Sequence, residues 1–376
     1  MSIVNLQSSP IFVRSPYIIE IDEPAQIEGR VDIYIWNNGD TPPSVPTYTL
    51  SKKIPNSSNL LLTFNISHYV REAISFNTSS NVNVNLLWGE IFDTEWAFVK
   101  VVRKVKYNGD TSFTTLTTKT WIALDGYGYY EQGYNPDLGN VLLQEGVYEY
   151  WYDPNNLPIG FQQNINRYGD LKIVLPQVDY QLRYTDLVTG ATFTTTYTAG
   201  LGTRYIVQPF LVYPLYAENG NLIEYLDDLG AVIWSATIKP ITECKYQVHS
   251  IDFVNNFGAW QRSFAFKVSR KSINVTTEQH DLFNRDLIYY NYEAPENKLF
   301  NVNGRKQIKV NTGWIYNESY NDIVLQPMML SERISIDDLP VIMQTRSTEL
   351  YENINQHLIN YELTFEYSYD VINNVV

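Results

Sequence analysis

The sequence predicts a mainly β protein with two or three β-sandwich or β-barrel-like domains and a few short helices. Short runs of alternating apolar and polar residues recur along the 376 residues, with turn residues between them, which is typical of sandwiches and barrels. The 30 tyrosines, with many threonines and valines, fit pleated and half-buried surfaces. No repeat period indicates a solenoid or a propeller.

The clearest strand pattern in the first part of the chain is Arg30–Trp36 (RVDIYIW), which alternates strictly and runs into the turn sequence Asn37-Asn38-Gly39-Asp40. Four more strands are predicted there: Asn59–Ile66, Val82–Trp88, Ala97–Tyr107 and Ser112–Leu124. The last two flank Asn108-Gly109-Asp110, so we expect them to form a hairpin with a tight turn.

Two further β patterns follow. Gln181–Tyr197 is hairpin-like and turns at Thr189-Gly190. Leu358–Tyr369 (LINYELTFEYSY) alternates apolar and polar residues almost without interruption, which predicts a sheet with one solvated face.

Helical patterns are few. Ser67 is a candidate N-cap for a short helix that runs to Phe76. Asn317 is a candidate N-cap for a second helix at about 317–330, in which Pro327 should end or kink the helix.

The turn-dense stretch Gly133–Pro158 is a candidate connection between two sandwiches. We therefore predict an N-terminal β-sandwich-like domain at 1–140 and a middle β-rich domain at 141–245. A C-terminal β domain at 246–376 carries the second helix.

Composition narrows the class of partners. The chain has 27 Lys and Arg residues against 41 Asp and Glu, a net charge of −14. An acidic chain is a poor partner for nucleic acid and for anionic membrane surfaces, so we expect neither nucleic-acid binding nor a membrane anchor. No apolar run reaches the roughly 18 residues needed to span a bilayer.

Cys244 is the single cysteine, so no internal disulfide can form, which fits a reducing cytosol. We expect Cys244 to be a small buried apolar residue. The N-terminal residues lack the basic and apolar regions of a signal peptide.

Catalytic signals are weak, and we expect no enzymatic activity, no catalytic residues, no cofactor and no metal site. The four histidines are scattered without metal-ligand spacing, and we expect them at the surface or at caps: His68, His249, His280 and His357. The sequence leaves a Ser-His-Asp triad open, because its members need not be neighbours, but it contains no Gly-x-Ser-x-Gly motif. Gly126-Tyr127-Gly128 lacks the third glycine and the helix of a dinucleotide fingerprint.

Carboxylates are plentiful but poorly paired. Asp227-Asp228 and Asp337-Asp338 are adjacent, and neighbours on a strand point to opposite faces, so solvated loop charge is the favoured interpretation.

Aromatic residues cluster near glycine turns at Trp121–Tyr134 and Tyr148–Tyr152. Such rings can form sandwich core, a protein interface or a platform for sugars. The candidate interface aromatics are Tyr127, Tyr129, Tyr130, Trp151 and Trp260.

Several segments resemble virion structural proteins of Bacteroidetes tailed phages, including the crAss-like group. The likeness is to tail hub or baseplate-type components. It rests on these segments: YTLSKKIP (48–55), FNISHYV (64–70), LDGYGYYEQGYN (124–135), NFGAWQ (256–261), GRKQIKVNT (304–312) and LINYELTFEYSYDVIN (358–373).

The resemblance implies a structural role in the virion tail, assembled in the cytoplasm of the host bacterium. The implied partners are copies of the chain in a ring and other tail proteins, namely ring, fibre or portal-proximal components. The C-terminal domain, with Trp260, is the expected ring-forming part, and the aromatic loops of the first domain are expected to face a neighbouring tail protein. The alternative is a tail fibre or adhesin module that binds host glycan through Tyr and Trp loops. A carboxylate-based depolymerase is a more distant third reading.

Overall fold

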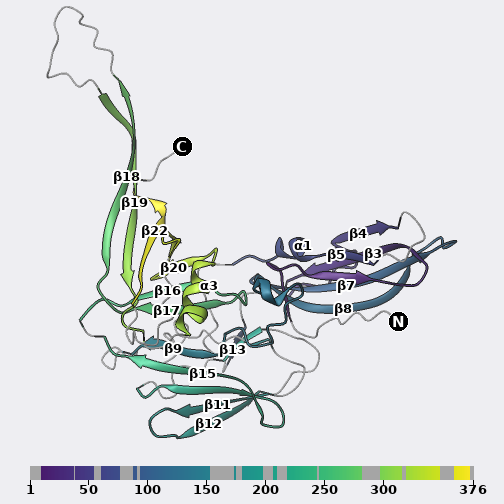
Figure 1. Ribbon diagram of the computed structural model, residues 1–376, viewed down its shortest axis with the longest axis horizontal. Helices are drawn as coiled ribbons and strands as arrows, with labels where there is room; N and C mark the ends of the chain where they lie inside the picture. The colour runs from purple at the N-terminus through teal and green to yellow at the C-terminus, as the bar shows by residue number, and fades with distance from the viewer. Residues whose placement is uncertain are drawn as a thin grey trace, which may run out of the picture. The chain divides into compact units, whose positions relative to one another are not determined.

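A computed structural model describes most of the chain (Figure 1). The described residues are 10–37, 39–54, 61–76, 88–90, 94–152, 173–174, 180–197, 206–209, 218–243, 245–281, 297–315, 319–347 and 360–372. The protein is mainly β, with several sheets and a few short helical segments, as predicted. Cys244, His357 and most of the predicted strand Val82–Trp88 lie outside the described residues.

The chain forms two compact units. Unit 1 comprises Met1–Thr242, Asp252–Ser263 and Ser319–Ser331, and unit 2 comprises Glu243–Ile251, Phe264–Glu318 and Glu332–Val376. The predicted boundary between 1–140 and 141–245 falls inside unit 1, so the three-domain division stays a prediction.

The first sheet of unit 1 has the order β1-β8-β7-β3-β4. Its strands are β1 (Ile11–Phe12), β3 (Gln26–Trp36), β4 (Tyr48–Lys53), β7 (Trp96–Tyr107) and β8 (Thr114–Leu124). The predicted strand at Arg30–Trp36 and the predicted hairpin are confirmed as β3 and β7–β8. Gly109, with φ +92°, makes the hairpin turn.

A two-stranded sheet of β2 (Ile18–Ile21) and β5 (Leu62–Asn65) packs with the first sheet around one apolar core. Alternate residues of each strand supply this core, as the sequence alternation requires. Its fully buried members include Ile19, Ile21, Val31, Ile33 and Val99.

Helix α1 (Ser67–Arg71) is shorter than the predicted helix to Phe76, and Ser67 is not its cap. The buried Ser67 hydroxyl donates to the Ser15 carbonyl at 2.6 Å and accepts from the Tyr17 N–H at 2.7 Å. Tertiary hydrogen bonds therefore take the oxygen that capping would need.

The second large sheet of unit 1 has the order β12-β11-β14-β15-β9. Its strands are β9 (Gly146–Trp151), β11 (Tyr180–Asp186), β12 (Thr192–Tyr197), β14 (Asn221–Leu226) and β15 (Val232–Ile241). The predicted hairpin at Gln181–Tyr197 is confirmed as β11–β12. A small third sheet joins β6 (Trp88–Glu90), β10 (Ile173–Val174) and β13 (Ile206–Pro209).

Two loops of unit 1 cross with their backbones in close contact. The Tyr127 N–H donates to the Asn256 carbonyl at 2.7 Å. A Cβ added at Gly258, where φ is +74°, would lie 2.7 Å from backbone atoms of Asp125 and Gly126. A Cβ at Gly126 would lie 2.6 Å from the Asn256 carbonyl oxygen, so Gly126 allows the two loops to pack together.

The predicted second helix consists of a π-helical turn η3 (Asn321–Leu325) followed by α3 (Gln326–Met329). Pro327 does not end this segment, which runs on to Met329, and it lies in the first turn of α3, where the helix changes from π to α geometry. The carbonyl of Ile323, four residues earlier, accepts a hydrogen bond from Gln261 Nε2 at 2.8 Å. A buried side chain thus supplies the donor that proline lacks.

The remaining sheet has the order β17-β16-β20-β21-β22-β19-β18. Its strands are β16 (His249–Val254), β17 (Trp260–Ala265), β18 (Arg270–Asp281), β19 (Asn297–Asn311), β20 (Ile334–Ile336), β21 (Leu339–Met343) and β22 (Glu362–Asp370). Strand β22 confirms the predicted C-terminal strand, with Leu363, Phe365 and Tyr367 buried on one face.

Candidate assembly interface and polar groove

Strands β18 and β19 of unit 2 form a long antiparallel ribbon (Figure 1). Their pairing runs from Arg270 opposite Lys309 to Asp281 opposite Asn297. The third strand, β22, pairs with β19 only from Asn311 to Arg305. Among the described residues, the outer part of the ribbon is therefore two-stranded.

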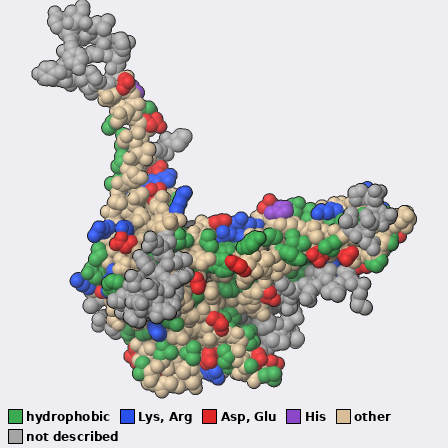
Figure 2. Space-filling view, in the orientation of Figure 1, with side chains coloured by type: hydrophobic (Ala, Val, Ile, Leu, Met, Phe, Trp, Pro, Cys, Tyr) green, Lys and Arg blue, Asp and Glu red, His purple; other side chains and the backbone are tan. Residues whose placement is uncertain are grey.

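Both faces of the ribbon are open to solvent. All 12 residues of β18 are exposed, as are most of the outer residues of β19. Figure 2 shows apolar side chains on its surface. The large apolar side chains that are roughly half exposed are Ile273, Val275, Leu299, Phe300 and Val302. An isolated two-stranded hairpin is marginal in water, so this ribbon has the properties of a surface that a partner covers.

The base of the ribbon is fixed to unit 2 by packing. Ile308 and Val310 of β19 are buried, and they lie opposite Phe365 and Leu363 of β22. Lys309 and Glu362 form an ion pair across the same two strands.

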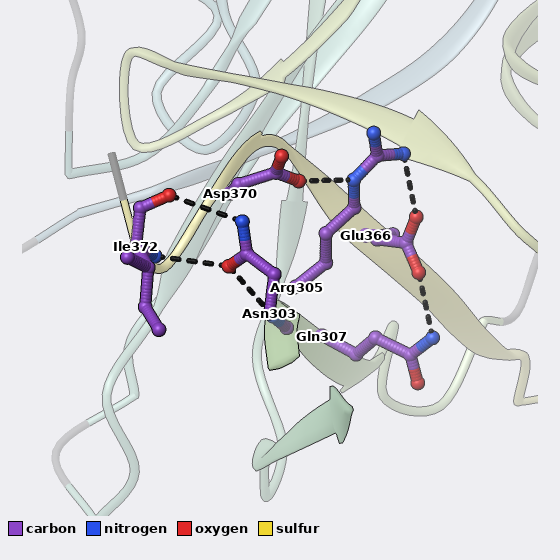
Figure 3. Close-up of polar contacts among 7 residues, drawn as sticks. Asn303, Arg305, Gln307, Glu366, Asp370 and Ile372 are labelled. Carbon is purple, nitrogen blue, oxygen red and sulfur yellow. Dashed lines mark hydrogen bonds and ion pairs between the residues drawn. The ribbon is translucent and has the colours of Figure 1, made fainter. Parts of the chain in front are cut away.

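The outer face of the base carries a network around Arg305 (Figure 3). Arg305 Nε donates to Asp370 Oδ1 at 2.8 Å, and its Nη1 lies 3.5 Å from Glu366 Oε1. Gln307 Nε2 donates to the other oxygen of Glu366 at 3.0 Å. Hydrogen bonding to Asp370 raises the pKa of Arg305, which keeps the network charged.

Asn303 fastens the end of β22 to the ribbon (Figure 3). Its Nδ2 donates to the Ile372 carbonyl, and its Oδ1 accepts from the N–H of Ile372, both at 3.1 Å. The Val371 N–H donates to the Gly304 carbonyl at 2.7 Å. These contacts continue the sheet past the last residue of β22.

A groove of about 310 Å³ lies beside this network. Its lining includes Asn274, Thr276, Asn303, Arg305, Glu366 and Asp370. The described lining consists of amide, hydroxyl, carboxylate and guanidinium groups and Gly304, so the groove can hydrogen-bond a polar chain.

A second polar cluster in unit 2 joins three segments around His249. His249 Nδ1 lies 2.6 Å from Asp337 Oδ2, and its Nε2 lies 3.0 Å from Ser269 Oγ. Because a carboxylate only accepts, Nδ1 is the donor to Asp337. The expectation of a surface or capping histidine is wrong here, since His249 is 1% exposed.

Asp337 lies in an exposed turn, as expected for a solvated loop charge, and its carboxylate is also hydrogen-bonded. Its carboxylate accepts from the Ser250 N–H at 3.0 Å. Burial opposes the charge, but the bonds from His249 and Ser250 outweigh it and lower the pKa of Asp337. Asp337 and Asp338 have φ +50° and +66° and form the turn between β20 and β21.

The side chains of Ser269, His249 and Asp337 are hydrogen-bonded in the same order as in a serine hydrolase triad. The burial of the carboxylate differs from that triad. In that triad the carboxylate is buried. Here 41% of the Asp337 side chain is exposed and the imidazole is enclosed. We interpret the cluster as a structural connection, because Ser269 directly precedes β18 and His249 begins β16.

The predicted interface aromatics have very different exposures. Tyr127 is buried beneath Arg14, whose guanidinium carbon lies 4.7 Å from the ring centre. Tyr129 is half-buried and packs edge-on against Tyr127, whereas Tyr130 is 98% exposed.

The two tryptophans of that set are both half-buried. Trp260 packs edge-on against Phe76, and its Nε1 donates to Glu95 at 3.1 Å. Trp151 is the last residue of β9. Of the five predicted aromatics, only Tyr130 is classed as exposed.

Comparisons with models of protein families and with curated protein sequences give no match to this chain. Within the described ranges, no group of three or more His, Cys, Asp or Glu side chains could hold a metal ion. The described helices are all too short or too polar to cross a membrane.

Proposed function

We propose that this chain is a non-enzymatic structural subunit of a bacteriophage tail, of the hub or baseplate type. It assembles in the host bacterial cytoplasm with copies of itself in a ring and with other tail proteins. The observation that carries the proposal is the β18–β19 ribbon, whose outer part is exposed on both faces.

A long exposed ribbon needs apolar burial to be stable. Ordering a strand costs conformational entropy, which burial of apolar side chains normally offsets. The outer ribbon buries little in the described chain but exposes Ile273, Val275 and Leu299. A partner that covers these side chains supplies the missing burial, as permanent assemblies do.

The resemblance to phage tail proteins supports the same region. Two of its segments, GRKQIKVNT and LINYELTFEYSYDVIN, include the inner part of β19 and all of β22. These two strands pair with each other at the base of the ribbon.

The test is incorporation of a shortened variant into phage particles. Replacing residues 277–302 by Asn-Gly closes the ribbon with a two-residue turn and keeps Asn303. The proposal expects the full-length chain in the tail of purified particles by electron microscopy, and loss of the variant from particles. Gln279→Asn, which keeps the ribbon length, is the control and should be incorporated.

Absence of the full-length chain from particles, or normal incorporation of the shortened variant, would contradict the proposal. Circular dichroism of the variant shows whether a loss reflects misfolding.

A second candidate, an adhesin that binds host glycan, is favoured by the exposure of Tyr130 and Tyr134, at 98% and 61%. Exposed tyrosines can stack on sugar faces. Binding on a glycan array that is lost in Tyr130→Ala would support this function over the hub.

A further inference from the structure

Strand β18 is an outer edge of its sheet in the described part of the chain. Natural proteins commonly protect such an edge with proline, a bulge or an inward-pointing charge. β18 contains neither proline nor glycine. The bulge in the ribbon carries its left-handed residue, Asn301 with φ +49°, on β19, so β18 stays extended. The edge is open to another strand.

The charges of β18 lie at its two ends and have opposite signs. Arg270 and Lys271 begin the strand, whereas Glu278 and Asp281 lie near its end. The six residues 272–277 (SINVTT) are uncharged, and four of them are β-branched. An antiparallel copy of the same strand therefore meets opposite charge at each end, and a parallel copy meets like charge.

Strand geometry then limits the registers that such a pair can adopt. Directly opposite residues of an antiparallel pair share a face, and a two-fold contact sets one residue opposite itself. Placing Lys271 opposite Asp281 meets both conditions and sets Thr276 opposite Thr276. Placing Arg270 opposite Glu278 also meets them, with Asn274 opposite Asn274, but it pairs only residues 270–278. The register centred on Thr276 pairs residues 271–281 and is the longer contact.

We propose that two copies of this chain pair through β18 in an antiparallel two-fold contact centred on Thr276. The inference rests on the proposed function in taking the ribbon as an assembly surface, and it names a second copy as the partner. Val275 lies diagonally across from Val275 of the second copy on one face, so the contact covers side chains that are now 52% exposed. A two-fold contact closes after two copies, so ring contacts use other surfaces.

Disulfide crosslinking tests the register. In a Cys244→Ser background, Thr276→Cys places two thiols across the axis, where opposite Cα atoms are about 4.5–5.5 Å apart. Mild oxidation should convert most of the protein into a covalent dimer. The matched control is Ser272→Cys, for which the same register sets the two cysteines about 27 Å apart. Equal crosslinking at both positions, or none at position 276, overturns the proposal.

A charge exchange provides a second test that leaves the fold alone, because both side chains are exposed. In the proposed register, position 271 of each copy lies opposite position 281 of the other. Either substitution alone, Lys271→Asp or Asp281→Lys, therefore places two side chains of the same charge opposite each other at both ends of the contact. Each variant alone should dimerise roughly tenfold more weakly than the parent in analytical ultracentrifugation. An equimolar mixture restores both ion pairs and should form a heterodimer of near-parental affinity. A mixture no tighter than its components overturns the proposal.

The two proposals fail separately. A chain that sits in the tail but gives no Thr276→Cys dimer would overturn the β18 contact and leave the tail function standing. A crosslinked dimer from a chain that is absent from particles would do the reverse.

Discussion

Gln261 supplies the hydrogen bond that proline removes from a helix. Its Nε2 donates to the carbonyl of Ile323, which the N–H of residue 327 would otherwise approach. The side chain is 2% exposed, so no water replaces it readily. A buried glutamine and a proline far apart in sequence are therefore coupled.

Substituting Gln261 by Ala should lower the free energy of unfolding by about 1–3 kcal/mol, because the Ile323 carbonyl is left without its donor. Chemical denaturation followed by tryptophan fluorescence measures this. Gln344→Ala, at an exposed position, is the control and should change stability by less than about 0.5 kcal/mol. If the two substitutions lowered the free energy of unfolding equally, the hydrogen bond from Gln261 to Ile323 would have no special role in stability.

The carboxyl group of Asp337 should make stability depend on pH. Its pKa is lowered in the folded state, so the unfolded chain binds its proton more readily as the pH falls. The stability it adds is present above the unfolded pKa and is lost as pH falls through the folded pKa. Asp337→Asn should therefore cost about 1 kcal/mol near neutral pH, and progressively less as the pH falls below the ordinary aspartate pKa of about 3.9.

Urea titrations across this pH range check the prediction. Asp228→Asn, in an exposed turn, is the control. A cost for Asp337→Asn that stays constant down to the lowest pH would contradict the assignment.

Ser269 should be chemically inert despite its contact with His249. The imidazole is enclosed and the carboxylate faces solvent, which is the reverse of a hydrolase triad. We expect no labelling of Ser269 by a fluorophosphonate probe, as read by mass spectrometry of the intact protein. Stoichiometric labelling that disappears in Ser269→Ala would argue for an enzyme.

Among the elements, the crossing of the two loops at Gly126 and Gly258 is set by backbone contact. Gly258→Ala should lower the free energy of unfolding by roughly 2–4 kcal/mol, because the new Cβ meets the backbone of Asp125 and Gly126. Gly230→Ala is the control that distinguishes the cost of the positive φ from the cost of the steric clash. Gly230 has φ +83°, but an added Cβ there meets no atom within 4 Å. It should cost only about 1 kcal/mol in thermal or chemical unfolding. Similar costs at both positions would show that φ alone matters.

Strands with one buried face could be predicted from the sequence. Alternation marked Arg30–Trp36, because core packing selects Val31 and Ile33 there, and the turn sequence Asn108-Gly109-Asp110 marked the hairpin of β7 and β8. Ser67 was predicted as a helix cap, and this prediction was wrong because its hydroxyl bonds to Ser15, which is distant in sequence.

The ribbon could not be predicted in the same way. β18 has no buried face, so no core selects its side chains and the sequence RKSINVTTEQHD carries no alternation. The His249 cluster was missed for another reason, since His249, Ser269 and Asp337 meet only after three separate segments pack. The run of β-branched residues at 273–277 was the one local signal for the ribbon.

For the whole molecule, the cores and the outer ribbon are separate. The apolar clusters of unit 1 and the buried side of β22 include no residue of β18. Replacing residues 277–302 by Asn-Gly should therefore shift the thermal midpoint by less than about 3 °C. Differential scanning calorimetry of the dilute protein checks this, and a loss of more than about 10 °C would mean that the ribbon stabilises the fold.

The hydrogen bonds between Asn303 and the backbone of Ile372 fix the end of β22 at the base of the ribbon, so a label attached near this point can locate the ribbon by imaging. A gold cluster or a small fluorescent domain appended after Val376 begins four residues beyond Ile372, within about 14 Å of extended chain. Such a tag would mark the foot of the ribbon in a micrograph of any assembly that contains this chain.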